Sequence, residues 1–181
     1  MSDAPHVSPD ARLADGRVPA TADDLFRRLD GLGIEVTTTK HEAVFTVEQA
    51  KAHRGAIPGG HAKNLFLKDK KGAMWLVVCL EDRKIDLKSL PAMLGSARLS
   101  LASPDRLMNF LGVIPGAVTP FAMINDRDGH VRIAFDRGVF EREPLNFHPL
   151  DNAMTTSISA RDMLAFLEAE GHEPMMIDFP D

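Results

Sequence analysis

The chain has 181 residues, of which 44% are hydrophobic, and a formal net charge of −5 at pH 7. This length and composition predict one domain with a sizeable core. No run approaches the roughly 18 apolar residues that cross a bilayer, and an acidic chain is unsuited to coating long nucleic acid. We therefore expect a cytoplasmic protein with no membrane or DNA partner, while a local contact with a nucleic acid end stays open.

The first part of the chain predicts an extension followed by a helix. Residues 1–20 mix Pro, Asp, Ser and Ala without periodicity, which indicates a flexible N-terminal extension before a single domain over 21–181. Thr21 matches a helix N-cap, with acidic residues in the first turn and Gly31 at the end. A β-branched strand is predicted over 34–39, and a capping box at Thr46 predicts a short helix to His53.

Two apolar runs, 62–69 and 73–80, predict a central β-hairpin that turns at Gly72. Lys63 and Asn64 open the first strand, directly after the glycine-rich bend 57–61. This position can present a cation and an amide to a small ligand. Alternatively, Lys63 extends its aliphatic stem along the sheet edge. Cys79, the single cysteine, lies in the second run and is expected to be a buried core residue.

The second half of the chain predicts short helices and strands in mixed order. Helices are expected over 86–94, 103–111 and 159–170, the last with Met163, Leu164, Phe166 and Leu167 facing inward. Strands are expected over 98–102, 121–125, 130–135, 145–149, 155–158 and 174–179, with a hairpin turn at 126–129. Hairpins interspersed with helices, without regular βαβ alternation, predict a mixed α/β fold.

The common catalytic motifs are absent from the chain. There is no Gly-x-Ser-x-Gly elbow, no phosphate-binding loop and no pair of His or Cys residues at zinc-ligand spacing, so we predict no metal and no cofactor. Lys63, Asn64, the loop 112–120 and His148 remain as candidates. The loop either aims backbone N–H groups at a carbonyl oxygen or is an ordinary connection. His148 is either a site residue or a partly buried structural histidine.

Four short segments together carry a family resemblance. They are Lys63-Asn64-Leu65-Phe66-Leu67, Gly116-Ala117-Val118-Thr119-Pro120, Val44-Phe45-Thr46-Val47-Glu48-Gln49-Ala50, and Phe147-His148-Pro149-Leu150 with Asn152, Thr155 and Thr156. In order and spacing they resemble the YbaK-like, prolyl-tRNA-editing superfamily. The match is best to its free-standing ProX (ProXp-ala) branch, which acts on alanyl-tRNA(Pro). The resemblance spans about residues 21–179.

The resemblance implies a single-domain fold with a curved mixed sheet and flanking helices. It also implies trans-editing, the hydrolysis of the ester that joins alanine to tRNA(Pro), because a proline pocket cannot strongly reject a smaller side chain. In this family the 2′-hydroxyl of the terminal adenosine is thought to assist, so no catalytic triad is needed. Cysteine or serine in place of alanine stays open, and so does a non-catalytic tRNA- or synthetase-binding module.

The same resemblance implies a role for each candidate residue. Lys63 would offset developing charge, Asn64 would orient the ribose or aminoacyl group, and Gly116 would hold the carbonyl. His148 would limit the size of an amino-acid pocket that is lined by Ala117, Val118, Thr119, Pro120 and Phe147.

Basic residues indicate where the acceptor end of tRNA(Pro) would bind. Candidates are Lys51 and Arg54 on the helix predicted after Thr46, and Arg98 on a short strand. Clusters of this kind also occur as ordinary solvated surface. Prolyl-tRNA synthetase is expected as a transient partner.

Overall fold

The computed structural model describes residues 6–43 and 57–180. Its helices are α1 (Ala22–Gly31), α3 (Leu90–Leu94), α4 (Pro104–Leu111), α5 (Ala160–Ala169) and the 3₁₀ helices η2 (Pro120–Asn125) and η3 (Arg137–Glu141). Its strands are β1 (Thr37–Lys40), β2 (Gly60–Asp69), β3 (Met74–Leu80), β4 (Leu99–Leu101), β5 (Val131–Asp136), β6 (Leu145–Phe147), β7 (Met154–Ile158) and β8 (Met175–Ile177). Among the described residues, no helix is long and apolar enough to cross a bilayer.

One mixed sheet contains all of these strands. Its order is β1-β7-β6-β2-β3-β5-β8, and β4 pairs with β2 beside that path. The pairs β2–β6, β3–β5 and β5–β8 are parallel, whereas β2–β3, β2–β4, β1–β7 and β6–β7 are antiparallel. The prediction of a mixed α/β fold with flanking helices is therefore confirmed.

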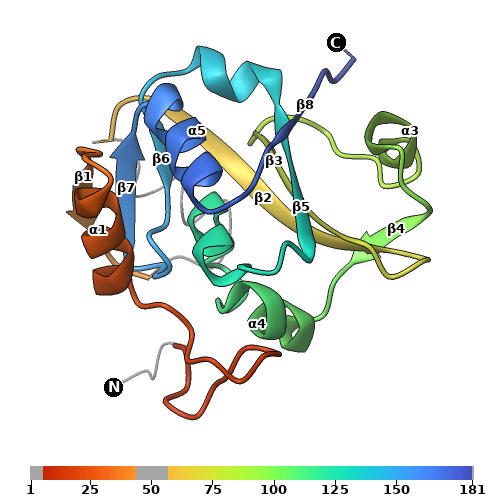
Figure 1. Cartoon of the computed structure of the whole chain (residues 1–181). Helices are drawn as coiled ribbons and strands as arrows, with labels where there is room; N and C mark the ends of the chain where they lie inside the picture. The colour runs from red at the N-terminus through yellow and green to blue at the C-terminus, as the bar shows by residue number, and fades with distance from the viewer. Residues whose placement is uncertain (1–5, 44–56, 181) are drawn as a thin grey trace.

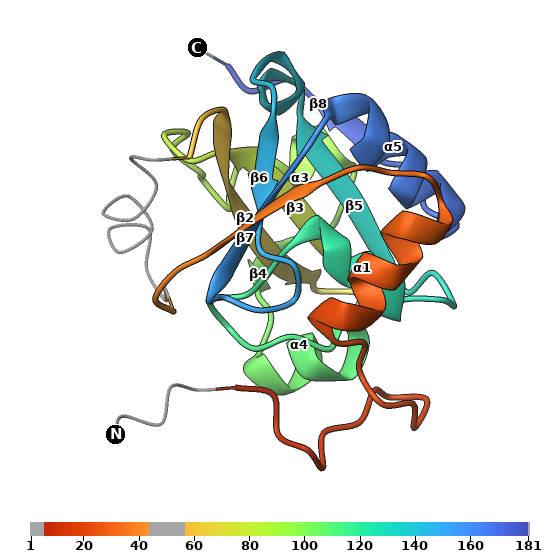
Figure 2. The same cartoon turned by 90° about the vertical axis from the view of Figure 1, so that its left-hand side faces the viewer.

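Helices cover both faces of the sheet (Figure 1 and Figure 2). Buried residues of α1, α4 and α5 pack with Phe66, Leu76 and Phe135 in the larger core cluster. Leu90 and Leu94 of α3 pack with Trp75 in a smaller cluster on the other face. Because both faces of β3 are covered, its residues from Met74 to Cys79 are all buried.

The glycine bend before β2 is held tightly against β6. Gly59 has a φ of +110°, and a Cβ at this position would lie 2.2 Å from the Pro144 carbonyl oxygen. Asn146 donates from Nδ2 to the carbonyls of Pro58 and Gly60, both at 3.1 Å. Only glycine fits this backbone conformation and this space, so the bend fixes where β2 begins.

Three predicted helix starts are confirmed by their caps. Thr21 and Asp24 form a capping box at α1. The side chains of Ser103 and Ser159 accept hydrogen bonds from the first turns of α4 and α5. The starts of these three helices were therefore predicted correctly from the short polar residue that precedes each amphipathic segment.

Other predictions were wrong in detail. Residues 121–125, predicted as a strand in a hairpin, belong to η2, whose N-cap is Thr119. The helix predicted over 86–94 is regular only from Leu90. Leu164, predicted to face inward on α5, is 37% exposed. The helix predicted over 47–53 lies outside the described residues.

The segment before α1 contacts the rest of the domain. Leu13 is 5% exposed, and the Ala14 N–H donates to the Asn109 carbonyl at 2.8 Å. The Ala20 N–H donates to Asn125 Oδ1 at 2.9 Å, and Arg17 donates to the Asn125 carbonyl at 3.0 Å. These contacts hold the segment against α4 and η2.

Candidate functional site

The central strand β2 lacks a described strand partner along part of one edge. On that edge β6 pairs only with Gly60 and His61, and β4 pairs only with residues 67–69. Residues 62–65 lie between these two partners and are called here the open stretch. This interruption leaves main-chain groups of the open stretch without a described strand partner on that edge.

The main-chain N–H and C=O of Asn64 point toward this unpaired edge of β2. The Gly60 N–H donates to the Pro144 carbonyl at 2.8 Å, and the Phe66 carbonyl accepts from the Ala102 N–H at 3.0 Å, both on this edge. Alternate residues of a strand aim their main-chain polar groups at the same edge, so the N–H and C=O of Asn64 share this orientation.

The side chain of Asn64 carries an unsatisfied acceptor. Its Oδ1 is buried and has no hydrogen-bond partner among the described residues. Asn64 has the same strand parity as Phe66, so it lies on the face of the larger core cluster. A buried amide oxygen without a partner costs about 1–3 kcal/mol. The Oδ1 of Asn64 can therefore accept a hydrogen bond from a further group.

Lys63 lies on the opposite face of β2 from Asn64. It has the parity of Leu65 and Leu67, which pack with the smaller cluster, and its Nζ donates to the Arg83 carbonyl. Cys79 stands opposite Lys63 in the register. The structure therefore does not place Lys63 and Asn64 side by side. Instead, their side chains extend from the open stretch to opposite faces of the sheet.

The loop from Gly116 to Pro120 packs on the face of Asn64. Ala117 is buried and Val118 is half-buried, and both contact the larger core cluster. Gly116 has a φ of +91°, which favours glycine. The Ala117 N–H donates to the Ile114 carbonyl at 3.0 Å. It is therefore already bonded within the loop and is not a free donor for a substrate.

The end of the predicted pocket segment is buried. Thr119 is fully buried, and its Oγ1 accepts from the Phe121 N–H at 3.2 Å. Pro120 is also buried, at the start of η2. Phe121 meets Phe147 edge to face, with ring centroids 6.3 Å apart. This contact links the loop to β6.

His148 follows β6 at the interruption in the sheet. β6 runs parallel to β2, with Leu145 opposite Gly60 and Asn146 opposite His61. Phe147 stays paired with Thr156 of β7, and the chain leaves the sheet after it, in the direction of the open stretch. His148 is half-buried, and its Nδ1 lies 2.7 Å from the Met154 carbonyl oxygen. Burial, together with nearby His41, lowers the pKa of His148 below its ordinary 6.5.

Of the predicted tRNA contacts, only Arg98 lies in the part of the chain that the structure describes. Arg98 is exposed, and its carbonyl accepts from the Lys70 N–H at 2.9 Å. The β2–β3 turn, which carries Lys70 and Lys71, therefore adjoins Arg98. Lys51 and Arg54 lie outside the described residues.

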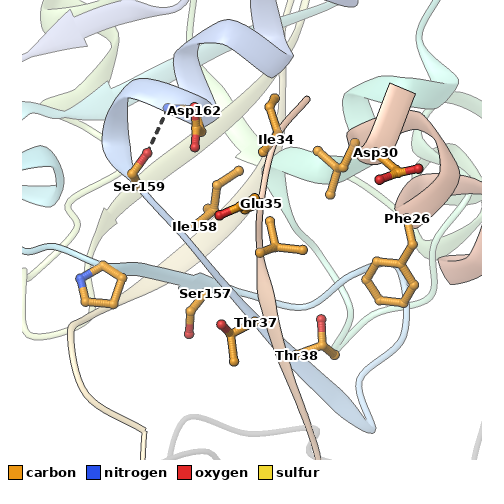
Figure 3. Close-up of a pocket in the computed structure, with 13 residues that line it drawn as sticks. Phe26, Asp30, Ile34, Glu35, Thr37, Thr38, Ser157, Ile158, Ser159 and Asp162 are labelled. Atoms are coloured by element: carbon orange, nitrogen blue, oxygen red, sulfur yellow. Dashed lines mark hydrogen bonds between the residues drawn. The ribbon is translucent and has the colours of Figure 1, made fainter. Parts of the chain in front are cut away.

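A separate groove of about 920 Å³ lies between α1, β1, β7 and the start of α5 (Figure 3). Its lining includes the acidic residues Asp30, Glu35 and Asp162, and none of the predicted site residues. Carboxylates repel phosphates, so the groove is unsuited to the tRNA backbone. Among the described residues, no three His, Cys, Asp or Glu side chains form a group that would hold a metal ion.

Two residues near His148 and the bend had no sequence signal. His41 lies with its ring centroid 6.0 Å from that of His148, although the two are 107 positions apart. Asn146, which holds the bend, is 86 positions from Gly60. Only the pairing of β6 and β7 with distant strands brings these residues to the site.

Comparison with known proteins identifies the family. A family model described as an aminoacyl-tRNA editing domain matches residues 41–166. The mouse "Prolyl-tRNA synthetase associated domain-containing protein 1" is 39% identical, over 86% of this chain and 95% of that protein. The "Prolyl-tRNA editing protein ProX" of Acetoanaerobium sticklandii is 39% identical, over 80% of this chain and 89% of that protein.

A solved structure supports the same fold. The "putative trans-editing enzyme for prolyl tRNA synthetase" superposes with a TM-score of 0.66 at 16% identity, over 89% of this chain and 99% of that chain. The matched residues 41–166 include the open stretch, the loop 116–120 and His148. The chain belongs to the aminoacyl-tRNA editing domain family.

Proposed function

We propose that this aminoacyl-tRNA deacylase hydrolyses alanine from mischarged tRNA(Pro). The observation that carries the proposal is the buried Oδ1 of Asn64, which has no partner in the described part of the chain. It lies at the interruption in the sheet, and the loop 116–120 packs on the same face. The similarity to ProX over 80% of the chain supports the same reading.

The aminoacyl end of the tRNA would enter the interruption at the open stretch. Asn64 would orient the ribose or the aminoacyl group by hydrogen bonding, and Gly116 would hold the ester carbonyl. Phe147 and residues 117–120 would form the apolar boundary for a small side chain, with His148 beside it. Because an aminoacyl ester is already activated, positioned water with help from the 2′-hydroxyl is sufficient for hydrolysis.

Lys63 would offset negative charge on the ester as the tetrahedral intermediate forms. Its Nζ is bonded to the Arg83 carbonyl, so this role requires it to exchange that bond for one to the substrate. A positioned cation stabilises the transition state more than the ground state, because the charge develops only during the reaction.

A deacylation panel tests the substrate. Ala-, Ser-, Cys- and Pro-tRNA(Pro), together with Ala-tRNA(Ala), are each incubated with the wild-type protein, and the loss of aminoacyl ester is followed. We expect Ala-tRNA(Pro) to be hydrolysed fastest. Faster hydrolysis of Ser- or Cys-tRNA(Pro) would move the proposal to those esters. Comparable hydrolysis of Pro-tRNA(Pro) would overturn the editing function.

Lys63→Ala tests the proposed charge. We expect kcat for Ala-tRNA(Pro) to fall about 10²–10³-fold, the range seen when one oxyanion-stabilising donor is removed. Lys68→Ala, on the same strand beyond the open stretch, is the matched control and should retain most activity. An unchanged circular dichroism spectrum would exclude misfolding, and wild-type kcat in Lys63→Ala would remove Lys63 from the mechanism.

Arg98 is proposed to contact the acceptor stem, together with Lys51 and Arg54. Removing one phosphate contact lowers the slope of log K against log salt by about 1. Arg98→Ala should therefore weaken tRNA(Pro) binding and flatten this slope in a titration over several salt concentrations. Arg161→Ala, an exposed arginine on α5, is the control. Equal slopes in wild type and Arg98→Ala would exclude Arg98 from the footprint.

A further inference from the structure

His41 and His148 are held by three consecutive residues at the start of β7. The Ala153 carbonyl accepts from the His41 N–H at 2.9 Å. The Met154 carbonyl oxygen lies 2.7 Å from His148 Nδ1, and Thr155 Oγ1 lies 2.7 Å from His41 Nε2. The two rings are tilted by 59° with centroids 6.0 Å apart. Thus one short segment fixes both imidazoles.

The contact with Met154 determines the tautomer of the neutral His148 ring. A carbonyl oxygen only accepts hydrogen bonds, so Nδ1 of His148 must carry the proton that it shares with Met154. In the neutral ring, Nε2 is then an acceptor with a free lone pair. Among the described residues, no hydrogen bond reaches this Nε2. His41 obeys the same rule, because its Nδ1 lies 2.7 Å from the Glu42 carbonyl oxygen.

Two acceptors on the neighbouring strands β2 and β6 therefore lack a donor among the described residues. Asn64 contributes its buried Oδ1, and His148 contributes Nε2 at the end of β6. An aminoacyl-adenosine end carries one strong cationic donor, the α-ammonium group. A hydrogen bond from an ammonium to a neutral imidazole is charge-assisted, whereas a protonated imidazole would repel the same group.

We propose that His148 accepts a hydrogen bond from the substrate's α-ammonium group through Nε2, and that His41 and Thr155 are positioning residues that hold His148 for this contact. The proposal rests on the proposed function, because it uses the aminoacyl ester as substrate. His148 would then select for an amino acid ester as well as border its side chain. His41 acts through β7 and by its ring contact, without touching the substrate.

The groups around His148 fix the direction of the pH dependence. Burial and the neighbouring His41 lower the pKa of His148, while the Met154 carbonyl and Asp151 oppose that shift. The neutral acceptor therefore predominates at pH 7, and deacylation should fall as the pH drops through this lowered pKa. Replacing His41 by Phe removes a neighbour that lowers the pKa of His148, so the acid limb of kcat/KM should move to higher pH.

Two variants at Thr155 distinguish a role in positioning His148 from a role in folding. Thr155→Val keeps the shape of the side chain but removes the hydroxyl that meets His41, and a lost hydrogen bond is expected to lower kcat/KM about 5–10-fold. Thr155→Ser restores the hydroxyl and should recover activity to within about twofold. Two outcomes would overturn the positioning role. One is an equal loss of activity in Thr155→Val and Thr155→Ser. The other is wild-type activity with an unmoved acid limb in both Thr155→Val and His41→Phe.

The ammonium contact has its own test. The lactyl ester of tRNA(Pro) replaces the α-ammonium by a hydroxyl of similar size, so we expect the wild-type protein to hydrolyse it at least tenfold more slowly than the alanyl ester. In His148→Asn this preference should shrink. Equal wild-type rates for the two esters would overturn the ammonium assignment.

A measurement without tRNA distinguishes failure of this proposal from failure of the proposed function. In protein with ¹⁵N-labelled imidazoles, NMR should show His148 in the Nδ1-protonated form, with the signal assigned from the His148→Asn spectrum. An Nε2-protonated ring would overturn the proposal whatever the enzyme hydrolyses. An Nδ1-protonated ring in a protein that hydrolyses no ester of the panel would instead overturn the proposed function, and with it the substrate contact.

Discussion

Cys79 occupies a position on β3 where its thiol has almost no access to solvent. It is 0% exposed, it stands opposite Lys63, and its Sγ donates to the Lys63 carbonyl at 3.9 Å. Burial raises the pKa of the thiol to about 12, although the charge of Lys63 acts in the opposite direction. The thiolate is the reactive form, so a thiol held protonated in the core is inert.

This environment predicts that Cys79 resists thiol reagents in the folded protein. At pH 8, Ellman's reagent should leave Cys79 unmodified over the time in which a free thiol reacts fully. In denaturing guanidinium chloride, one thiol per chain should react at once. Rapid, complete reaction under native conditions would show that β3 opens locally and that Cys79 is not a fixed core residue.

The sequence predicts Lys63 and Asn64 as candidate site residues on one strand. Side chains of adjacent strand residues point to opposite faces, so strand alternation alone implies that the two cannot lie side by side. What the sequence could not supply is the interruption at the edge of β2. That feature depends on β6 and β4 pairing with different parts of one strand.

Among the elements, those with local signals were predicted best. Thr21, Ser103 and Ser159 each cap a helix through a contact within three residues, so the sequence contains the whole motif. The run 121–125 was predicted as a strand because short apolar runs do not distinguish a strand from a buried helical turn, although Thr119 and Pro120 before it are a local helix-start signal. The Thr119 side chain accepts from the Phe121 N–H and so favours a helical turn here.

Substitution of Gly59 tests how tightly the bend before β2 is packed. Gly59→Ala places a Cβ 2.2 Å from the Pro144 carbonyl oxygen at a φ of +110°. Backbone strain of about 1–2 kcal/mol adds to an overpacking cost of about 1–3 kcal/mol. We therefore expect the free energy of unfolding, measured in urea, to fall by at least about 2 kcal/mol.

Gly72→Ala is the matched control for this substitution. Gly72 in the β2–β3 turn also has a positive φ, +90°, but nothing lies within 4 Å of the added Cβ. The free energy of unfolding of Gly72→Ala should therefore fall only by the contribution of backbone strain, about 1–2 kcal/mol. If both variants lost the same stability, contact with Pro144 would not be what requires glycine at position 59.

For the whole molecule, the topology assembles the site from distant parts of the chain. The open stretch comes from β2, the loop 116–120 precedes η2, and His148 follows β6. His148 then depends on β7, and β7 pairs with β1 next to His41. Composition and periodicity predict the helices and strands, but only the order of the strands in the sheet brings these segments together (Figure 1).

The N-terminal segment tests the boundary of the domain. Removing residues 1–20 would expose the surface that Leu13 covers and would leave Asn125 Oδ1 without the Ala20 N–H. Burial of one leucine contributes about 1.5–3 kcal/mol, and each lost hydrogen bond about 1 kcal/mol. We expect the truncated protein to lose at least about 2 kcal/mol in urea unfolding, although residues 1–20 were predicted to be a flexible extension.

Two controls distinguish the loss of buried contacts from the shortening of the chain as the cause of lower stability. Deletion of residues 1–7 keeps Leu13 and Arg17, so its unfolding free energy should stay close to that of the full chain. Leu13→Ala in the full chain should reproduce a large part of the loss, because it removes the buried side chain alone. If deletion of 1–20 left stability unchanged, the domain would begin at Thr21, and the contacts to Asn125 would contribute nothing to folding.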